Sequence, residues 1–181
     1  MKSQIIFIAG IYGVGKSFLC NKLSCTFNIP FYSSGDLISQ LNGEVYGSNK
    51  SVKDKDKNQD LLIEAVNKKL INEKNFLLAG HFSILNSNME IELLPDYVFE
   101  QLHIKIIVLL EADPCCIAEN LKKRDNKEYP IDVLIKMSCI EKEQAVITAN
   151  RLNIPLITYK LSYEESDERE LKKKLKDGGL I

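Results

Sequence analysis

The sequence predicts an α/β fold built around a parallel β-sheet. Short apolar runs, each the length of one buried strand, alternate along the chain with longer stretches whose apolar residues recur every three or four positions. Strands that alternate with helices in this way form parallel sheets with right-handed crossovers. The chain has 181 residues, of which 45% are hydrophobic, and this is enough for one sizeable core. We therefore expect a single domain over residues 1–181.

Five apolar segments are predicted to be the strands of this sheet. They are Ile5–Ala9, Asn28–Tyr32, Asn75–Ala79, Ile104–Leu110 and Ile154–Tyr159. The fourth is continuously apolar, which is typical of a parallel strand that is buried on both faces. Helical spacing follows the first strand and returns near Leu61, Pro114, Ile131 and Glu164. Residues 82–102 are less regular, and no element is assigned to them.

Residues Gly10–Ser17 match the pattern G-x-x-x-x-G-K-[ST] in full and lie between the first predicted strand and a predicted helix. Glycines in such a loop allow the backbone N–H groups of Gly13–Ser17 to point at phosphate oxygens, beside the positive end of the helix. Lys16 can reach the β- and γ-phosphates, and the Ser17 hydroxyl is a hard ligand suited to Mg²⁺. A glycine-rich turn with no ligand would need neither residue. We therefore predict that the loop binds ATP with Mg²⁺. The expected contacts are Gly10, Tyr12, Gly13, Val14, Gly15, Lys16, Ser17 and Phe18.

Small polar residues follow the second and third predicted strands. Open α/β sheets bind ligands at the carboxyl ends of their strands, so Ser33–Asp36 and His81 are candidates for a binding site. Two alternatives stay open at this point: Ser34 or Asp36 could simply cap a helix, and His81 could bind substrate, shuttle a proton or be structural. Ala79 ends the third strand, where P-loop folds commonly carry the acidic residue that helps to hold magnesium.

Two acidic residues later in the chain have an open role. Glu111 ends the fourth strand, where its carboxylate could face a metal ion or could accept hydrogen bonds from nearby backbone. The neighbouring Asp113-Pro114 is explained by helix chemistry, because aspartate is a good N-cap and proline a good first helical residue. Glu141 lies on the apolar face of the helix that begins near Ile131, and is either paired with a base such as Arg124 or directed at the ligand.

Composition and charge narrow the classes of function. The formal net charge is −1, so no basic surface is expected to hold nucleic acid, and a small substrate fits better. No N-terminal signal and no apolar run of transmembrane length are seen, so we expect a soluble, cytoplasmic protein without a membrane partner. The five cysteines show neither a C-x-x-C pair nor a zinc spacing, and we expect reduced core residues.

Residues 43–59 differ from the rest of the chain in composition. They are rich in Gly, Ser and Asn and in alternating Lys and Asp, with almost no apolar residue. A segment of this kind is expected to form a mobile flap whose charges face solvent.

Four of these elements together resemble the nucleoside monophosphate kinase family of P-loop proteins, especially small adenylate kinases of the archaeal type and related bacterial ATP-binding proteins. They are the loop Gly10–Ser17, Ser33–Leu37, Ala79–His81, and Leu109–Pro114 with Arg124-Asp125 downstream. The resemblance covers Ile5 to about Leu156. It implies an adenylate kinase-like P-loop NTPase fold, with a five-stranded parallel sheet in the order 2-3-1-4-5 flanked by helices.

The resemblance also implies two moving parts over the site. An acceptor-binding flap would span about residues 35–72, and a short lid about residues 124–131. Ser34, Gly35 and Asp36 would lie near the acceptor, and Arg124 would contact the transferring phosphates as the lid closes.

The departures from the family concern arginine. Members normally hold their substrates with several arginines, because the guanidinium binds phosphate oxygens in a fork that lysine cannot copy. The arginines of this chain are Arg124, Arg151 and Arg169. Residues of other types stand where the family has arginine: Ser39, Asn120 and Lys142. Ala79 replaces the usual aspartate. We expect the chain to bind ATP despite these changes, but the resemblance does not identify the phosphate acceptor.

The first hypothesis is an Mg²⁺–ATP-dependent phosphotransferase that acts on a nucleotide, a nucleoside or another small metabolite. Lys16 and Arg124 would be its catalytic residues, and Asp36, His81 and Glu141 would hold the acceptor. The alternative is a slow NTPase or nucleotide-sensing module that acts through a partner protein. The shortage of arginine and the presence of Ala79 favour this second hypothesis. A kinase acting on nucleic-acid ends is disfavoured by the absence of a basic surface.

Overall fold

A computed structural model describes residues 4–42, 55–70, 72–86 and 88–177 of the chain. Its main element is a five-stranded parallel sheet in the order β2-β3-β1-β6-β7. The strands are β1 Gln4–Ala9, β2 Phe31–Ser33, β3 Asn75–Ala79, β6 Ile104–Glu111 and β7 Leu156–Lys160. Counted along the chain within this sheet, the order is 2-3-1-4-5, which confirms the predicted topology.

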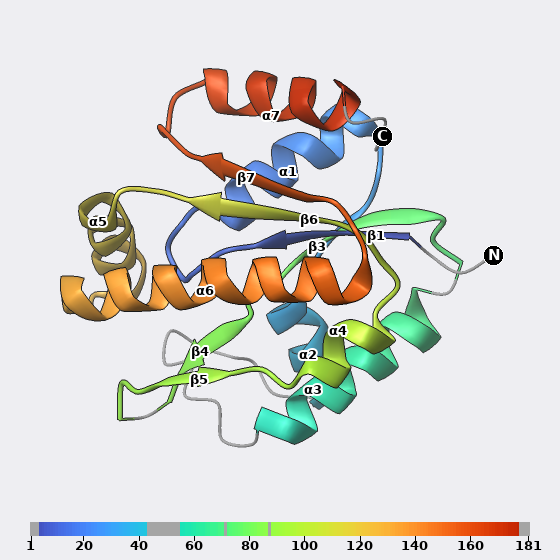
Figure 1. Ribbon diagram of the computed structural model, residues 1–181, viewed down its shortest axis with the longest axis horizontal. Coiled ribbons are helices and arrows are strands. Elements are labelled where there is room, and N and C mark those ends of the chain that lie inside the picture. The colour runs from blue at the N-terminus through green and yellow to red at the C-terminus, as the bar shows by residue number, and fades with distance from the viewer. Residues whose placement is uncertain (1–3, 43–54, 71, 87, 178–181) are drawn as a thin grey trace.

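Helices cover both faces of the sheet (Figure 1). Lys16–Phe27 (α1) and Ser166–Asp177 (α7) lie on one face. The other face carries α2 Ser34–Asn42, α3 Lys55–Glu64, α4 Asp96–Gln101 and α6 Ile131–Leu152. Pro114–Asp125 (α5) lies near the carboxyl ends of the strands, and the π-helix Ala65–Lys69 continues α3.

The central strand β1 supplies both cores because successive side chains of a strand point to opposite faces. Ile5, Phe7 and Ala9 belong to the cluster under α2, α3 and α4. Ile6 and Ile8 belong to the cluster under α1 and α7. All five side chains are buried, so β1 is a fixed base for the loop that follows it.

Two strands begin later than the sequence predicts, and the reason is the same in both. The ladder of β2 starts at Phe31 and that of β7 at Leu156, each directly after a proline. Pro30 and Pro155 accept ladder hydrogen bonds from Leu77 and Ile107 at 2.9 and 3.0 Å, but proline has no N–H to donate. The residues before them therefore belong to connections rather than to strands.

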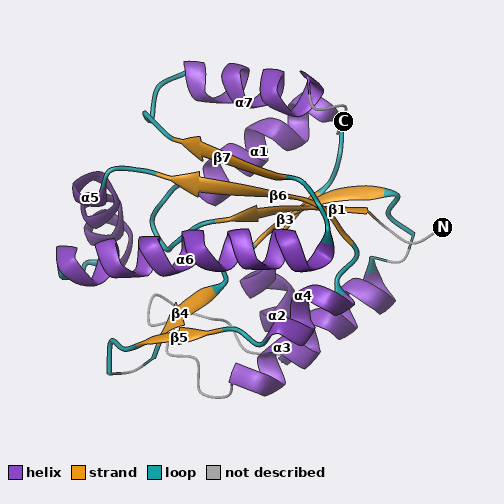
Figure 2. Cartoon of the chain, in the orientation of Figure 1, coloured by secondary structure: helices purple, strands orange, loops and turns teal. Residues whose placement is uncertain are grey.

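Residues 82–102, to which the sequence assigns no element, contain the strands of a second sheet. Ser83–Leu85 (β4) and Ile91–Leu93 (β5) pair antiparallel, apart from the main sheet and below α6 in the view of Figure 2. Strands of three residues are too short to show a period-2 pattern, which explains why the sequence did not predict them.

Helix α3 also differs from expectation. It begins at Lys55, so Asn58 and Asp60 lie inside the helix and do not cap it. Of the predicted flap, residues 43–54 lie outside the described residues. None of the helices in the described ranges is both long and apolar enough to cross a membrane.

The cysteines form no disulfide among the described residues, but the prediction that they lie in the core is wrong for all except Cys20. Cys20 is buried, whereas the others are exposed: Cys25, Cys115, Cys116 and Cys139. Cys115 and Cys116 lie in the first turn of α5, where Asp113 caps the helix as predicted by accepting from the Cys115 N–H at 2.8 Å.

Candidate active site

The phosphate loop joins the carboxyl end of β1 to the first residue of α1. Gly13 has φ +76°, in the left-handed region that L side chains rarely adopt. A Cβ at this position would lie 2.6 Å from Leu121 Cγ, so the loop can pass this close to α5 only with glycine there. From the same helix, Asn120 Nδ2 donates to Gly13 O at 3.1 Å. The loop conformation is thus held by α5 as well as by its own sequence.

Lys16 lies inside the curve of this loop. Its Nζ donates to Gly10 O at 2.6 Å and to Ile11 O at 3.0 Å. The ammonium is therefore held by backbone carbonyls at the start of the loop, next to the positive end of α1. This is where the sequence predicts that phosphate oxygens bind.

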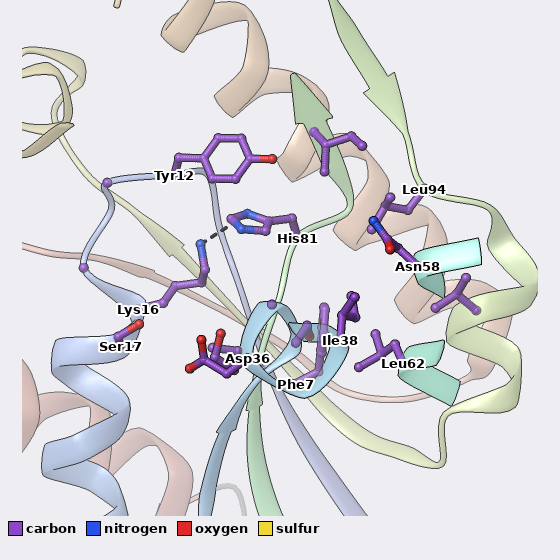
Figure 3. Close-up of a pocket in the computed structure, with 18 of the residues that line it drawn as sticks. Phe7, Tyr12, Lys16, Ser17, Asp36, Ile38, Asn58, Leu62, His81 and Leu94 are labelled. Atoms are coloured by element: carbon purple, nitrogen blue, oxygen red, sulfur yellow. Dashed lines mark hydrogen bonds between the residues drawn. The ribbon is translucent and has the colours of Figure 1, made fainter. Parts of the chain in front are cut away.

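His81 lies against the same group (Figure 3). Its Nδ1 is 2.8 Å from Gly10 O and 3.3 Å from Lys16 Nζ. A carbonyl can only accept and an ammonium can only donate, so the contact with Gly10 O requires a proton on Nδ1 whereas a bond from Lys16 requires a lone pair there. The two contacts therefore belong to different tautomers, and the shorter one leaves the lone pair of a neutral ring on Nε2. The Tyr12 ring packs against the imidazole at 4.4 Å between centroids. Burial raises the pKa of Tyr12 well above its usual value, so its phenol stays protonated.

A cavity of about 550 Å³ extends from the loop along the carboxyl edge of the sheet. One part, which we call the loop half, is lined by Tyr12, Gly13, Gly15, Lys16, Ser17, Phe18, Asn120, Arg124 and Tyr163. The other part, which we call the apolar half, is lined by Phe7, Ile38, Leu62, Ile84, Leu94, Val98, Phe99 and Leu102, with Ser34, Asn58 and Gln59. Asp36 and His81 lie between the two halves (Figure 3).

The residues after β2 enter the cavity wall directly. Ser34, Gly35 and Asp36 form the first turn of α2 and line the cavity at this edge of the sheet. The Ser34 Oγ is buried and has no hydrogen-bond partner, so its side chain does not cap the helix. Ser39, which stands in place of an arginine, donates to Gly35 O at 2.8 Å within its own helix.

Arg124 lines the loop half but is engaged by its neighbour in the chain. Its Nε and Nη2 donate to the two carboxylate oxygens of Asp125 at 2.5 and 2.6 Å. Tyr129 holds the same carboxylate through its hydroxyl at 3.1 Å, and the Asp125 side chain is only 5% exposed. The guanidinium is thereby fixed at the end of α5, at the mouth of the loop half.

Glu141 has a role that neither sequence hypothesis included. It is 1% exposed and accepts from Phe82 N at 2.9 Å, from Ser83 N at 3.0 Å and from Ser83 Oγ at 2.7 Å. It also accepts from Gly10 N at 3.3 Å. Burial raises the pKa of this carboxyl, although the hydrogen bonds from Phe82 and Ser83 oppose the shift. The expectation that Glu141 holds the acceptor is corrected: it joins α6 to the start of the loop and to the start of β4.

Glu111 is corrected in a similar way. Its carboxylate lies 3.1 Å from Lys142 Nζ, and it is not among the residues that line the cavity. The position of Glu111 therefore does not support the prediction that it could bind a metal ion. Lys142, which replaces an expected arginine, is the partner of this acid rather than part of the cavity wall.

The donor set of the cavity fits a magnesium ion bound together with phosphates. Ser17 offers a hydroxyl in the first turn of α1, and Asp36 offers a carboxylate from α2. Within the described residues there is no cluster of three or more His, Cys, Asp or Glu side chains that could hold a metal alone. Magnesium commonly takes one or two protein oxygens and completes its shell with phosphate oxygens and water.

Several residues of the cavity could not be found from the sequence. Asn58 and Gln59 are buried polar residues in a segment whose composition indicates a solvated flap. Val98, Phe99 and Leu102 come from a segment with no assigned element. Tyr163 follows β7 in a turn and reaches the loop half. None belongs to a motif, and only the fold brings them together.

The parallel sheet, with its loop between β1 and α1, is the fold of P-loop kinases. Residues 9–136, more than half of the chain, match the family model described as AAA domain. The chain therefore belongs to the AAA domain family.

Solved structures share this fold at low sequence identity. A shikimate kinase from Acinetobacter baumannii in complex with shikimate is 16% identical, with a TM-score of 0.63 over 99% of this chain and 94% of that chain. One from Bacteroides thetaiotaomicron is also 16% identical, with a TM-score of 0.62 over 96% and 98%. A gluconokinase from Sinorhizobium meliloti is 14% identical, with a TM-score of 0.50 over 98% and 97%. The comparison with curated proteins finds no match.

Proposed function

We propose that this protein is an Mg²⁺–ATP-dependent phosphotransferase that acts on a small-molecule acceptor. The observation that carries the proposal is the shape of the cavity, which begins at the phosphate loop and continues into a second half with a different lining. A nucleotide triphosphate in the loop half leaves this second half for another molecule. A cavity that served hydrolysis alone would need space only for water beside the phosphates.

The residues on the border of the two halves have the chemistry that transfer requires. Phosphoryl transfer depends mainly on positioning and on neutralising charge, and Lys16 and Arg124 are the cations of the loop half among the described residues. When phosphates bind, Lys16 exchanges its carbonyl partners for phosphate oxygens. Magnesium, held by Ser17 and by Asp36 directly or through water, would neutralise further charge on the phosphates.

The reaction moves one phosphoryl group and one proton. The acceptor oxygen forms a bond to the γ-phosphorus while the bond from the γ-phosphorus to the bridging oxygen breaks, and that electron pair leaves on ADP. The proton of the acceptor hydroxyl passes to Nε2 of His81 in the tautomer that is protonated on Nδ1, or to the Asp36 carboxylate when that carboxylate holds the metal only through water.

The names of the structural neighbours support a small acceptor. They include kinases named for shikimate and gluconate, and one of these structures holds shikimate. We further propose that residues 35–72 include the acceptor-binding flap and that residues 124–131 form a short lid, with Arg124 at its base.

The proposal is tested by a coupled assay of ATP turnover with nucleoside monophosphates, nucleosides and small hydroxylated metabolites. We expect at least one acceptor to stimulate ADP release and to appear as a phosphorylated product by mass spectrometry. ATP turnover that no acceptor stimulates would contradict the proposal.

A second candidate function is that of a slow NTPase or nucleotide-sensing module read by a partner protein. The observation that favours it is the pair of hydrogen bonds from Arg124 to the Asp125 carboxylate, because these bonds hold the arginine of the loop half on a neighbouring residue. Slow hydrolysis that is independent of acceptor, together with partner association that requires nucleotide, would support this candidate over the first.

A further inference from the structure

The apolar half of the cavity has the lining of a site for an uncharged molecule. Phe7 and Phe99 stand edge to face at 5.7 Å between centroids and line its wall together with aliphatic side chains from α2, α3 and α4. Binding of an apolar molecule to such a surface lowers the free energy, because apolar area is removed from water. Its occupant must therefore have an apolar body.

Two buried oxygens in this half have no hydrogen-bond partner. They are Gln59 Oε1 on α3 and Ser34 Oγ on α2, and Gln59 is only 5% exposed. A buried polar atom without a partner costs about 1–3 kcal/mol, so two in residues that line one cavity indicate groups that a bound molecule could complete after a small movement of the side chains. The Gln59 oxygen can only accept, so the ligand must supply an O–H or N–H there.

The charges around the apolar half disfavour an anion. The cations among the described lining residues, Lys16 and Arg124, belong to the loop half, where Lys16 binds loop carbonyls and Arg124 is forked to Asp125. Moving a phosphate or carboxylate against an apolar wall is expensive unless a cation pairs with it, and the described residues that line this half include no cation.

We propose, on the basis of the proposed function, that the phosphate acceptor is an uncharged alcohol with an apolar or aromatic body. A hydroxyl or N–H of this molecule donates to Gln59 Oε1, Ser34 Oγ makes a second hydrogen bond, and the reacting hydroxyl faces Asp36 and His81. Phosphorylated or carboxylated acceptors are the poorer substrates. Gln59 is thus a specificity-determining residue, which no sequence motif marks.

The test uses pairs of probes that differ in one charged group. Thymidine is compared with thymidine 5′-monophosphate, and methyl shikimate is compared with shikimate. Binding is measured by calorimetry in the presence of a non-hydrolysable ATP analogue, and phosphoryl transfer is measured separately with ATP. We expect the neutral member of at least one pair to bind tenfold or more tightly than its anionic partner.

Outcomes for the ligand class and for the proposed function can be told apart. If a neutral probe binds as expected but no probe stimulates ATP turnover, the phosphotransferase function fails while the ligand class stands. If an anion is phosphorylated better than its neutral partner, the function stands and this inference is overturned. The inference is also overturned if no neutral probe binds.

A variant separates ligand binding from a structural role. Gln59→Leu removes the unpartnered oxygen while keeping a similar volume, so the protein without ligand should unfold at the same or a higher temperature. Binding of the preferred neutral probe should weaken tenfold or more, and affinity for ATP should stay within twofold. The control is Gln40→Leu, at an exposed position of α2 outside the cavity lining, which should change neither affinity. A lower unfolding temperature for Gln59→Leu with unchanged probe binding would overturn the proposal.

Discussion

The two halves of the cavity are built in different ways. The loop half comes mainly from one continuous segment, Tyr12–Phe18, and each role that we propose for it follows from local chemistry: glycine for the turn, lysine for the phosphates, serine for the metal. The apolar half comes from β1, α2, α3, β4 and α4, whose residues contribute volume and a few polar atoms. The comparison teaches that the proposed nucleotide binding is encoded locally, whereas the proposed recognition of a second molecule is encoded in the packing.

The largest effect is expected from Lys16→Ala, which removes the point charge of the loop half. Phosphoryl transfer should fall by about 10³-fold or more, because loss of one charged or polar contact to the transition state commonly costs 10²–10³-fold and the proposed role of this lysine includes ATP binding. The fold should be retained, which circular dichroism would check. Lys136→Ala, at an exposed position of α6, is the control and should behave as wild type. Full activity in Lys16→Ala would refute the role of the loop.

Glu141→Gln should destabilise the protein at the point where α6 holds the start of the phosphate loop and the start of β4. The amide would place an N–H donor among the N–H donors of Gly10, Phe82 and Ser83, and we expect the free energy of unfolding to fall by about 2–3 kcal/mol. Chemical denaturation measures this change. Glu143→Gln, at an exposed position of the same helix, should have almost no effect. Equal stabilities of the two variants would contradict the structural role of Glu141.

Two glycine substitutions should affect ATP binding and acceptor binding separately. A Cβ on Gly13 would lie 2.6 Å from Leu121 Cγ, and a Cβ on Gly80 would lie 2.6 Å from Phe7 Cε2. Overpacking costs about 1–3 kcal/mol, so each variant should lose about tenfold or more in one affinity. Gly13→Ala should raise the Kd for ATP, and Gly80→Ala should raise the KM for the acceptor while the ATP Kd changes less than about threefold. Identical profiles would mean that the halves are not independent.

Arg124→Lys should reduce kcat by about tenfold or more and change the ATP Kd by less than about threefold, because lysine cannot form the planar fork that contacts two oxygens together. Steady-state kinetics and calorimetry give the two quantities. An unchanged turnover would remove Arg124 from the reaction.

The smallest effect concerns the turn that carries Tyr163 into the loop half. Asp167 accepts from the N–H groups of Ser162 and Tyr163 and from the Tyr159 hydroxyl. Burial raises the pKa of Asp167, but these hydrogen bonds outweigh burial and the net pKa is lowered. Its stabilising contribution is therefore present above the unfolded pKa of about 3.9 and is lost as pH falls through the lower folded value.

Denaturation curves between pH 7 and pH 3 test this dependence. Asp167→Asn should cost about 1 kcal/mol at pH 7 and should lose less stability than wild type on acidification below about pH 4. The same acid sensitivity in both proteins would contradict the assignment.

Much of the sheet could be predicted because its strands are long and apolar. Asn75–Ala79 has the predicted bounds, and the cap at Asp113 and the start of α6 at Ile131 are confirmed. These features depend on backbone geometry and on burial along one segment, both of which a sequence displays. The three-residue strands β4 and β5 were missed because such a length shows no period.

By itself the sequence determined the phosphate loop, the α/β class and the place of the site at the carboxyl edge of the sheet. The loop depends on local conformation, since its glycine, lysine and serine act within one turn of the chain. The fold class and the place of the site follow from the alternation of strands and helices along the sequence. Only the tertiary structure decided that Glu141 supports the loop, that Arg124 binds Asp125, and that Gln59 is buried in the cavity lining rather than exposed to solvent. The physical reason is that each of these depends on which distant element meets the side chain, and a buried polar group looks like a surface one until its neighbours are known.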